Sequence, residues 1–199
     1  MKLWKASNIR KREDISYYDT SGIFEAERFA AQLNRLILEE LRRQEKAGVI
    51  FLCIGTDRST GDSLGPLVGH KLRRRRLKRA AVIGTLERPV HAMNLDLYAR
   101  YIRLHHSDCV VVAIDASVGS PDHVGFATLG RGALQPGLGV SKDLEAVGDI
   151  SITGIVGGGG SPDPVMLQSV RRSMVMKMAD CICDSISLVE KFWESAATI

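Results

Sequence analysis

Apolar and polar residues follow each other in blocks along the chain, and their spacing predicts helices and strands in turn. Over residues 24–46 the apolar positions recur every three or four residues, which predicts an amphipathic helix that stops at Gly48. Glu40 interrupts the apolar stripe, so the neighbouring Leu41 is expected to make the contact with the core. Residues 49–54 are all apolar, as is typical of a strand in a parallel sheet covered on both faces.

The same alternation continues towards the end of the chain. Further helices are expected over 63–79, 94–105 and about 163–192, and further strands over 81–86, 109–114, 123–129 and 148–156. Strands that alternate with helices predict an α/β domain of three layers (α/β/α) around a mostly parallel sheet with right-handed crossovers. Residues 1–22 have no clear period and are expected to form an N-terminal arm, while 23–199 form a single α/β domain.

Composition fits an ordinary globular domain. The chain has 199 residues and contains no run of about 18 apolar residues, so no membrane-spanning helix is expected. The first residues are too polar for a secretory signal. The four cysteines lack the CxxC spacing of zinc ribbons and disulfide frameworks, which favours reduced thiols and a cytoplasmic location.

Positive charge is concentrated in one short segment. The net charge is +4, but residues 70–80 alone carry seven Lys or Arg and no acid. This segment is either the solvated end of a surface helix or a patch that steers an acidic partner. No aromatic residues interleave with its arginines, so nucleic acid is not the expected partner.

The loop after the first all-apolar strand resembles a phosphate-binding loop but lacks its chemistry. Five residues separate Gly55 from Gly61, where a P-loop has four, and Asp62 stands where the P-loop lysine belongs. The two glycines do not form a dinucleotide fingerprint either. An aspartate at this position would repel a phosphate, so nucleotide binding is not expected.

The same loop places a carboxylate at the start of a helix, and a second acid occupies a similar place. Asp115 follows the predicted strand 109–114 directly. Ligands of open parallel sheets bind outside the carboxyl ends of the strands, and neighbouring strands lie about 4.8 Å apart. Asp62 and Asp115 are therefore expected to share a site, although each has a structural alternative, as an N-cap and as a turn former respectively.

Two close carboxylates do not titrate independently. Repulsion raises one pKa, so one group keeps its proton and acts as a general acid while the other acts as a base. This suits the attack of water on a carbonyl group and protonation of the leaving amine. It equally suits a divalent metal ion, and the residues alone leave both open.

Longer strings carry a family resemblance. Between about residues 48 and 190 the chain contains, in order, FLCIGTDRSTGDSLGPLVG, GTLERPVHAMNL, AIDASVG, PGLGVSKDLEAVGDISITGIV and MVMKMAD. In these strings it resembles the YyaC-type sporulation proteins, which are similar to the spore germination protease and, more distantly, to hydrogenase maturation proteases. The resemblance implies a phosphorylase/hydrolase-like α/β fold and a peptidase role in the cytoplasm of the mother cell or forespore of spore-forming bacteria.

The resemblance also implies a catalytic pair. The germination protease has two proposed catalytic aspartates, one in a Gly-rich loop before Leu-Gly-Pro and one after an apolar strand; these patterns fall on Asp62 and Asp115. Small acid-soluble spore proteins are the implied substrates. Hydrogenase maturation proteases instead bind nickel through two acids and a downstream histidine. Only His123 follows Asp115, at a distance of eight residues, so no cofactor is expected, although a divalent metal ion stays open.

Four further residues are substrate-binding candidates. Asp57 and Arg58 lie in the first loop, where they orient a peptide or pair with each other, and His91 belongs to one of the family-like strings. Asp149 directly precedes the apolar stretch 150–156 of the predicted strand 148–156 and is also a candidate, with an exposed strand surface as its alternative. The rival function is a non-catalytic sporulation module that keeps the protease fold and binds a partner through 70–80. The expected partner of the peptidase is a protein or peptide, with no membrane involved and a homo-oligomer left open.

Overall fold

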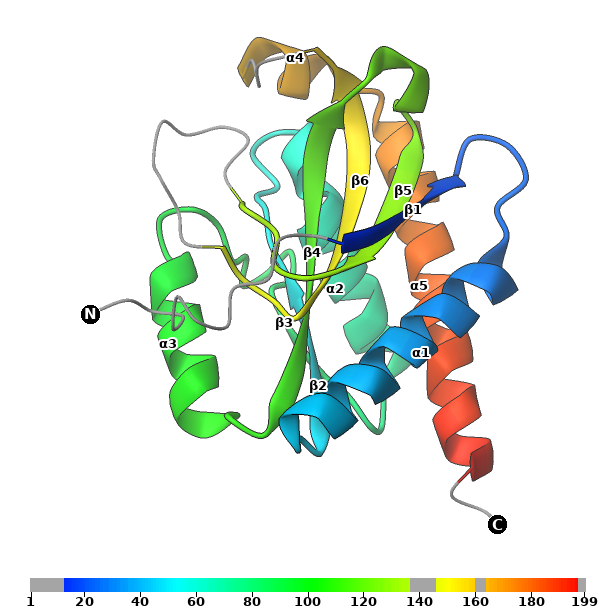
Figure 1. Cartoon of the computed structure of the whole chain (residues 1–199). Coiled ribbons are helices and arrows are strands. Elements are labelled where there is room, and N and C mark those ends of the chain that lie inside the picture. The colour runs from blue at the N-terminus through cyan, green and yellow to red at the C-terminus, as the bar shows by residue number, and fades with distance from the viewer. Residues whose placement is uncertain (1–12, 137–145, 160–163, 197–199) are drawn as a thin grey trace.

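The computed structural model describes residues 13–136, 146–159 and 164–196 (Figure 1). Its strands form one sheet in the order β1-β5-β6-β4-β2-β3. The strands are β1 (Glu13–Asp19), β2 (Gly48–Cys53), β3 (Ala81–Ile83), β4 (Cys109–Gly119), β5 (Phe126–Arg131) and β6 (Ile150–Gly158). The helices are α1 (Ala26–Gln44), α2 (Leu64–Arg75), α3 (Leu95–His105), α4 (Pro164–Ser169) and α5 (Arg172–Ala196), with short 3-10 turns η2 (Gly61–Ser63) and η3 (Pro121–His123).

The sheet is parallel at its centre and antiparallel at one side. Strands β3, β2, β4 and β6 run in the same direction, whereas β5 is antiparallel to β6 and β1 is antiparallel to β5. The predicted α/β fold with a mostly parallel central sheet is therefore confirmed. The carboxyl ends of β2 and β4 lie at the same edge, because Cys53, the last residue of β2, pairs with Ile114.

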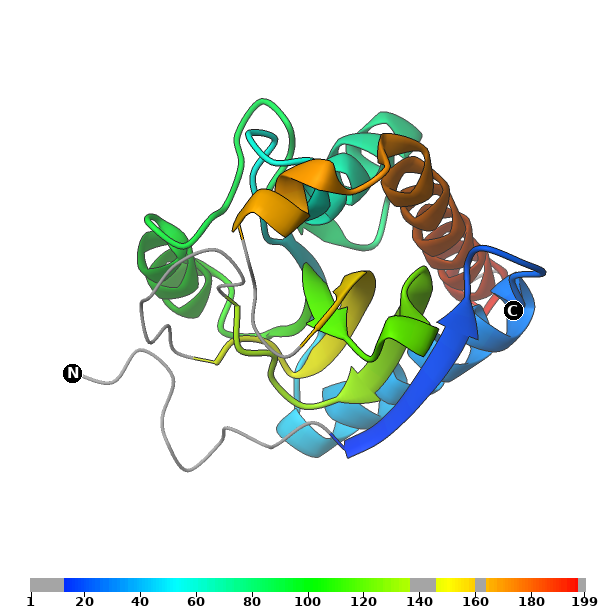
Figure 2. The ribbon, with the colours of Figure 1, turned by 90° about the horizontal axis from the view of Figure 1, so that it is seen from above.

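Helices cover the two faces of the sheet unequally (Figure 2). Alternate residues of β4, such as Val110 and Val112, belong to the larger core, to which α1, α2 and α5 contribute their buried side chains. The residues between them, Val111 and Ala113, belong to a smaller core to which α3 contributes Leu95 and Ile102. The domain has three layers, but in the described residues one of its outer layers is the single helix α3 with flanking loops.

Several boundaries differ from the expectation: the strand expected over 81–86 is only Ala81–Ile83, and the helix expected over 63–79 ends at Arg75. Three further differences change the architecture. Residues 13–19, inside the expected arm, form the edge strand β1, and residues 1–12 lie outside the described part of the chain. Strand β4 continues five residues beyond Ile114. The long C-terminal helix is interrupted between α4 and α5, which lets Leu167 of α4 pack against Gly61 of η2.

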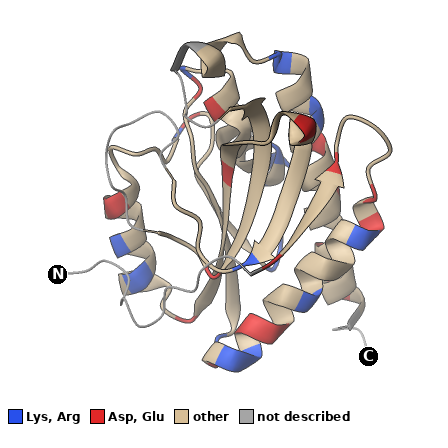
Figure 3. Cartoon of the chain, turned by 45° about the horizontal axis from the view of Figure 1, so that its top comes forward, with Lys and Arg blue, Asp and Glu red and all other residues tan. Residues whose placement is uncertain are grey.

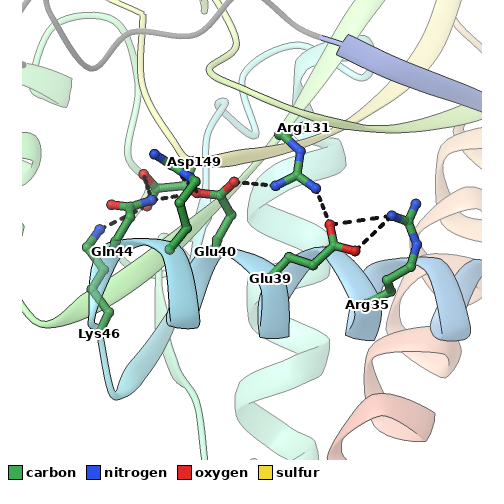
Figure 4. Close-up of polar contacts among 8 residues, drawn as sticks. Arg35, Glu39, Glu40, Gln44, Lys46, Arg131 and Asp149 are labelled. Carbon is green, nitrogen blue, oxygen red and sulfur yellow. Dashed lines mark hydrogen bonds and ion pairs between the residues drawn. The ribbon is translucent and has the colours of Figure 1, made fainter.

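Glu40, which was expected only to interrupt the apolar stripe of α1, has a structural role of its own. Its side chain is fully buried and accepts hydrogen bonds from Arg131 of β5, from Arg43 and, at 2.7 Å, from Gln44 (Figure 4). Burial alone would raise the pKa of Glu40, but hydrogen bonds from these three partners lower it below its usual value. A buried carboxylate with this many donors joins α1 to the sheet. Arg131 also pairs with Glu39, the residue before Glu40 in α1.

The four cysteines, all within the described residues, are free, and Cys53 and Cys183 are buried. Burial raises the pKa of both buried thiols, that of Cys183 to about 12, so they behave as small apolar residues of the core. None of the described helices combines the length and the hydropathy that are needed to cross a bilayer.

Replacing Arg131 by methionine is expected to lower the free energy of unfolding by about 3–5 kcal/mol, because the buried Glu40 loses a principal partner for its charge. Urea denaturation of the variant and the wild type measures the difference. Arg35→Met is the matched control, since Arg35 pairs with Glu39 on the surface of α1, where an ion pair contributes about 0–1 kcal/mol. Equal losses in the two variants would contradict the role assigned to the buried pair.

Candidate active site

The loop that leaves β2 is held at both ends by backbone hydrogen bonds. At its start, the N–H of Ile54 donates to the carbonyl of Ile114 at 2.7 Å, and the N–H of Gly55 donates to that of Val90 at 2.7 Å. At its end, the N–H of Thr56 donates to the carbonyl of Asp62 at 3.1 Å, so the loop closes on itself. The middle of the loop, at Asp57 and Arg58, is exposed.

Two glycines let this loop and α2 approach the end of β2 closely. Gly55 has a φ of +139°, and a Cβ atom there would lie 2.0 Å from the carbonyl oxygen of Asp62. A Cβ atom on Gly65, in the first turn of α2, would lie 2.0 Å from the carbonyl oxygen of Ile54. Only glycine fits at either position without a shift of the backbone. The side chain of Leu167 packs against Gly61, so η2 is held against both α4 and β4.

Asp62 lies in η2, immediately before α2, and is half-buried. It is not the N-cap of α2: the N-cap residue is Ser63, and neither the N-cap of η2 nor that of α2 makes a side-chain capping bond. No other described residue forms a hydrogen bond with the Asp62 carboxylate, which faces the cavity described below. Burial raises the pKa of this carboxyl above its usual value.

Asp115 lies inside β4 rather than directly after a strand, which corrects the expectation. Since β2 ends opposite Ile114, Asp115 still stands just beyond the end of β2 and faces the loop that leaves it. Its side chain is only 7% exposed, and its Oδ1 accepts a hydrogen bond from the N–H of Ala116 at 2.8 Å. Burial raises the pKa of Asp115 well above its usual value, and the negative charge of Asp62 raises it further. The two carboxylates thus interact electrostatically.

Both carboxylates line one open cavity of about 490 Å³ at the carboxyl edge of the parallel strands. Three of the four proposed substrate-binding residues line it as well, namely Asp57, Arg58 and His91. The rest of the lining is Ile54, Gly55, Thr56, Leu86, Pro89, Ala92, Met93 and Pro136. The structure therefore brings together five of the six residues that the sequence singled out.

His91 is positioned by a tight turn that leads into α3. The carboxamide of Asn94 accepts a hydrogen bond from the N–H of His91 at 2.8 Å and donates one to the carbonyl of Pro89 at 3.1 Å. The His91 ring accepts a hydrogen bond from the N–H of Met93 through Nδ1, at 3.2 Å. Because Val90 bridges to Ile54 in parallel, this turn lies beside the loop that carries Asp62.

Asp149 is not part of the cavity. It precedes β6, and the residue before a parallel strand lies at the amino edge of the sheet, opposite to the edge that carries Asp62. Its carboxylate accepts hydrogen bonds from the N–H of Val111 at 2.9 Å, from Gln44 at 2.9 Å and from Lys46 at 3.1 Å, so it binds α1 and the chain after it to β4 (Figure 4). The residue has a structural role, neither in substrate binding nor as an exposed strand surface.

Sequence reasoning missed two features around the pair. Met93 lines the cavity, and the only feature of the sequence that pointed to it was its place in the family-like string GTLERPVHAMNL. Asp115 also lies in register with Thr153 of β6, which lies opposite Thr128 of β5, and the two threonine hydroxyls are 2.6 Å apart. All three side chains are buried, so a polar row crosses the sheet from the site. This polar row could not be predicted from the sequence, because its residues become neighbours only through the order of the strands in the sheet.

The described residues contain no group of three or more His, Cys, Asp or Glu side chains arranged to hold a metal ion. His123, the histidine that follows Asp115, lies in η3 and stacks on Tyr17 with ring centroids 4.6 Å apart, and it does not line the cavity. The part of the chain that the structure describes therefore does not fit a nickel site made of two acids and a downstream histidine.

Comparison with known families decides where the chain belongs. A family model described as "Protein of unknown function (DUF1256)" matches residues 23–185. The chain belongs to this family. It is also 40% identical over 186 residues to "Uncharacterized protein YyaC" of Bacillus subtilis (strain 168), an alignment that covers 94% of this chain and 87% of that protein. The sequence resemblance to the YyaC-type proteins is confirmed.

One solved structure is similar at a much lower level. The [NiFe] hydrogenase maturation protease HycI from Thermococcus kodakarensis KOD1 aligns with a TM-score of 0.40 and 17% identity, over 76% of this chain and 99% of that chain. Similarity of this degree transfers no role to any residue.

Asp115→Asn is expected to raise the free energy of unfolding at neutral pH and to lose this advantage in acid. A carboxyl whose pKa is raised in the folded state contributes stability that is complete below its unfolded pKa, 3.8, and is lost as pH rises towards the folded pKa. The loss is about 1.4 kcal/mol per pH unit within that window. Asparagine does not ionise, yet it keeps the oxygen that accepts the Ala116 hydrogen bond.

Urea denaturation of both proteins between about pH 4 and pH 8 measures this effect. The two unfolding curves should converge at the acid end and separate as pH rises. Asp57→Asn, which changes an exposed acid of the same cavity, is the matched control and should show no such divergence. A parallel pH dependence of Asp115→Asn and the wild type would show that burial of this carboxyl has no energetic cost.

Proposed function

We propose that the chain is a peptidase that hydrolyses peptide bonds with Asp62 and Asp115 as an acid–base pair. The observation that carries the proposal is that these two carboxylates, from η2 and β4, line the same open cavity. Acid–base catalysis needs two groups with different proton affinities, and the unequal burial of the two side chains supplies that difference.

The burial of each group sets its role. Asp62 is the more exposed and ionises first, so its carboxylate accepts a proton from water while the water oxygen attacks the carbonyl carbon of the peptide bond. Asp115 is the more deeply buried and keeps its proton, which passes to the leaving nitrogen as the C–N bond breaks. Transfer of the proton from Asp62 to Asp115 then restores the starting state. The reaction consumes one water and releases a carboxylic acid and an amine.

The rim of the cavity provides groups that orient a peptide backbone. Asp57 and Arg58 present a carboxylate and a guanidinium on one side, and the imidazole of His91 lies on the wall formed by the turn before α3. We further propose small acid-soluble spore proteins as the substrates and the cytoplasm of a spore-forming cell as the place of action, as the resemblance of the sequence to the YyaC-type sporulation proteins and the spore germination protease implies. In this proposal the enzyme needs no metal ion.

Asp62→Asn and Asp115→Asn are each expected to reduce cleavage of small acid-soluble spore proteins by about 100- to 10,000-fold, the usual contribution of a general acid or base. Mass spectrometry of the cleavage products over time gives the rate. Asp122→Asn is the control, because Asp122 is an exposed acid of η3 outside the cavity. Circular dichroism establishes that each variant is folded.

Unchanged cleavage by either folded aspartate variant would remove that residue from the reaction. Each assay is repeated after treatment with a chelator, which should leave the rate of the wild type unaltered. A loss of activity on chelation, restored by a divalent cation, would contradict the metal-free form of the proposal.

A second candidate function is a non-catalytic module that binds an acidic partner through residues 70–80. Within this segment Lys71, Arg75 and Lys78 form ion pairs with acids of α5, so the segment is partly neutralised by its own fold. The observation that favours binding is the exposure of Arg73 and Arg74, which line an open depression of about 390 Å³ together with His70, Glu87 and Arg88.

Arg73→Glu combined with Arg74→Glu separates the two functions. If the module is the main activity, charge reversal abolishes co-purification of an acidic partner, whereas Asp62→Asn leaves the complex intact. Pull-down from lysates of sporulating cells, followed by reconstitution with the purified partner, measures this. The peptidase proposal predicts the reverse pattern, with cleavage retained in the arginine variant and lost in the aspartate variant.

A further inference from the structure

Helix α3 is apolar on two sides. One side packs on the sheet through Leu95, Ala99 and Ile102. The other carries Leu97, Tyr101 and Leu104, which are 70%, 48% and 65% exposed, although their spacing of four and three residues places them on one helix face. We call these three residues the α3 stripe. A group of large apolar side chains exposed on one helix face is typical of a binding site for a protein or another ligand.

The turn that leads into α3 forms part of the wall of the candidate active site. Met93, which is 75% exposed, lines the cavity and stands four residues before Leu97, at the entry to α3. Met93 and His91 belong to the same turn, so the wall of the cavity leads directly to the helix. Helix α3 lies at the outer side of the molecule, away from α1, α2 and α5 (Figures 1 and 2).

We propose that the α3 stripe docks the protein substrate of the peptidase, by binding an amphipathic segment next to the peptide bond held in the cavity. This inference rests on the proposed function. The docked segment carries apolar side chains at positions i, i+4 and i+7, or the equivalent spacing, which fit against Leu97, Tyr101 and Leu104. Arg100 lies exposed within the same stretch of helix, so acidic residues beside the apolar positions complement the surface better than basic ones.

The size of the surface favours a substrate over a second copy of the chain. Leu97 and Leu104 are seven residues apart, which is about 10 Å along a helix. A stable dimer interface buries about 800 Å² on each partner, more than three partly exposed side chains offer. A small apolar contact is enough for a polypeptide whose neighbouring segment already occupies the cavity, because the second contact is then made within one complex.

Charge on α3 supports the same occupant. The helix carries one acidic residue, Asp96, and two basic residues, Arg100 and Arg103 (Figure 3). At 100° per residue all three fall on one side of the α3 stripe, so the apolar surface is narrow and has one charged flank with an excess of positive charge. A narrow apolar stripe with a charged flank suits one amphipathic segment.

Binding to a variant that does not cleave tests the docking separately from the chemistry. The chain with both Asp62→Asn and Asp115→Asn is titrated against two fluorescein-labelled 20-residue peptides of identical composition. One peptide places leucine at helical i, i+4 and i+7 spacing among glutamates, and the other has the same residues scrambled. Fluorescence anisotropy gives the Kd. The amphipathic peptide is expected to bind at least tenfold more tightly than the scrambled one.

Adding Leu97→Ser and Leu104→Ser to the same chain is expected to raise the Kd of the amphipathic peptide at least tenfold. Ile23→Ser is the matched control, since Ile23 is 93% exposed and lies outside the stripe, and it should leave the Kd unchanged. Because these side chains project into solvent, the Tm of each variant should stay close to that of its parent.

Three results would overturn the proposal: equal binding of the two peptides, an unchanged Kd in the leucine variant, or a dimer in sedimentation velocity that Leu97→Ser with Leu104→Ser converts to a monomer. The last result would assign the α3 stripe to a second copy of the chain. Failure of the peptidase chemistry shows itself elsewhere, as undiminished cleavage by the folded aspartate variants, so the two failures are distinguishable.

Discussion

The close approach of the first turn of α2 to the end of β2 determines the position of Asp62. The carbonyl of Ile54 occupies the space that a side chain on Gly65 would need, and the carbonyl of Asp62 does the same at Gly55. The loop between them therefore has little freedom at its ends. This constraint directs the Asp62 side chain into the cavity and towards β4, where the register of the parallel strands has already placed Asp115.

The pair illustrates how a sheet can hold two acids at different proton affinities. Asp115 lies within a central strand of the sheet, in line with the buried threonines of β6 and β5, whereas Asp62 lies in η2 and is only half-buried. The difference in burial comes from the positions of the two residues in the fold, without any further charged partner. The positions of the two residues in the fold therefore determine which of the two carboxyl groups has the higher pKa.

The sequence predicted the elements and the meeting of the two acids, because apolar periodicity and the strand-end rule depend on local pattern alone. It misplaced Asp149, which precedes a parallel strand and so lies at the opposite edge from Asp62 and Asp115. It also misjudged Glu40, whose burial depends on Arg131, a residue 91 positions away. Local patterns do not reveal partners that the topology alone brings together. The short edge strand β1 was missed for a related reason, since its pairing with β5 is antiparallel and long-range.

The unequal covering of the sheet gives the two sides of the molecule different resistance to local unfolding. Most of the buried apolar side chains lie on the face covered by α1, α2 and α5, whereas α3 is attached through a small cluster. Segments with few buried contacts open more readily in local fluctuations than those in a large core. Substitutions on the exposed face of α3 therefore have little effect on global folding, whereas those at Leu95 and Ile102 disturb the smaller core.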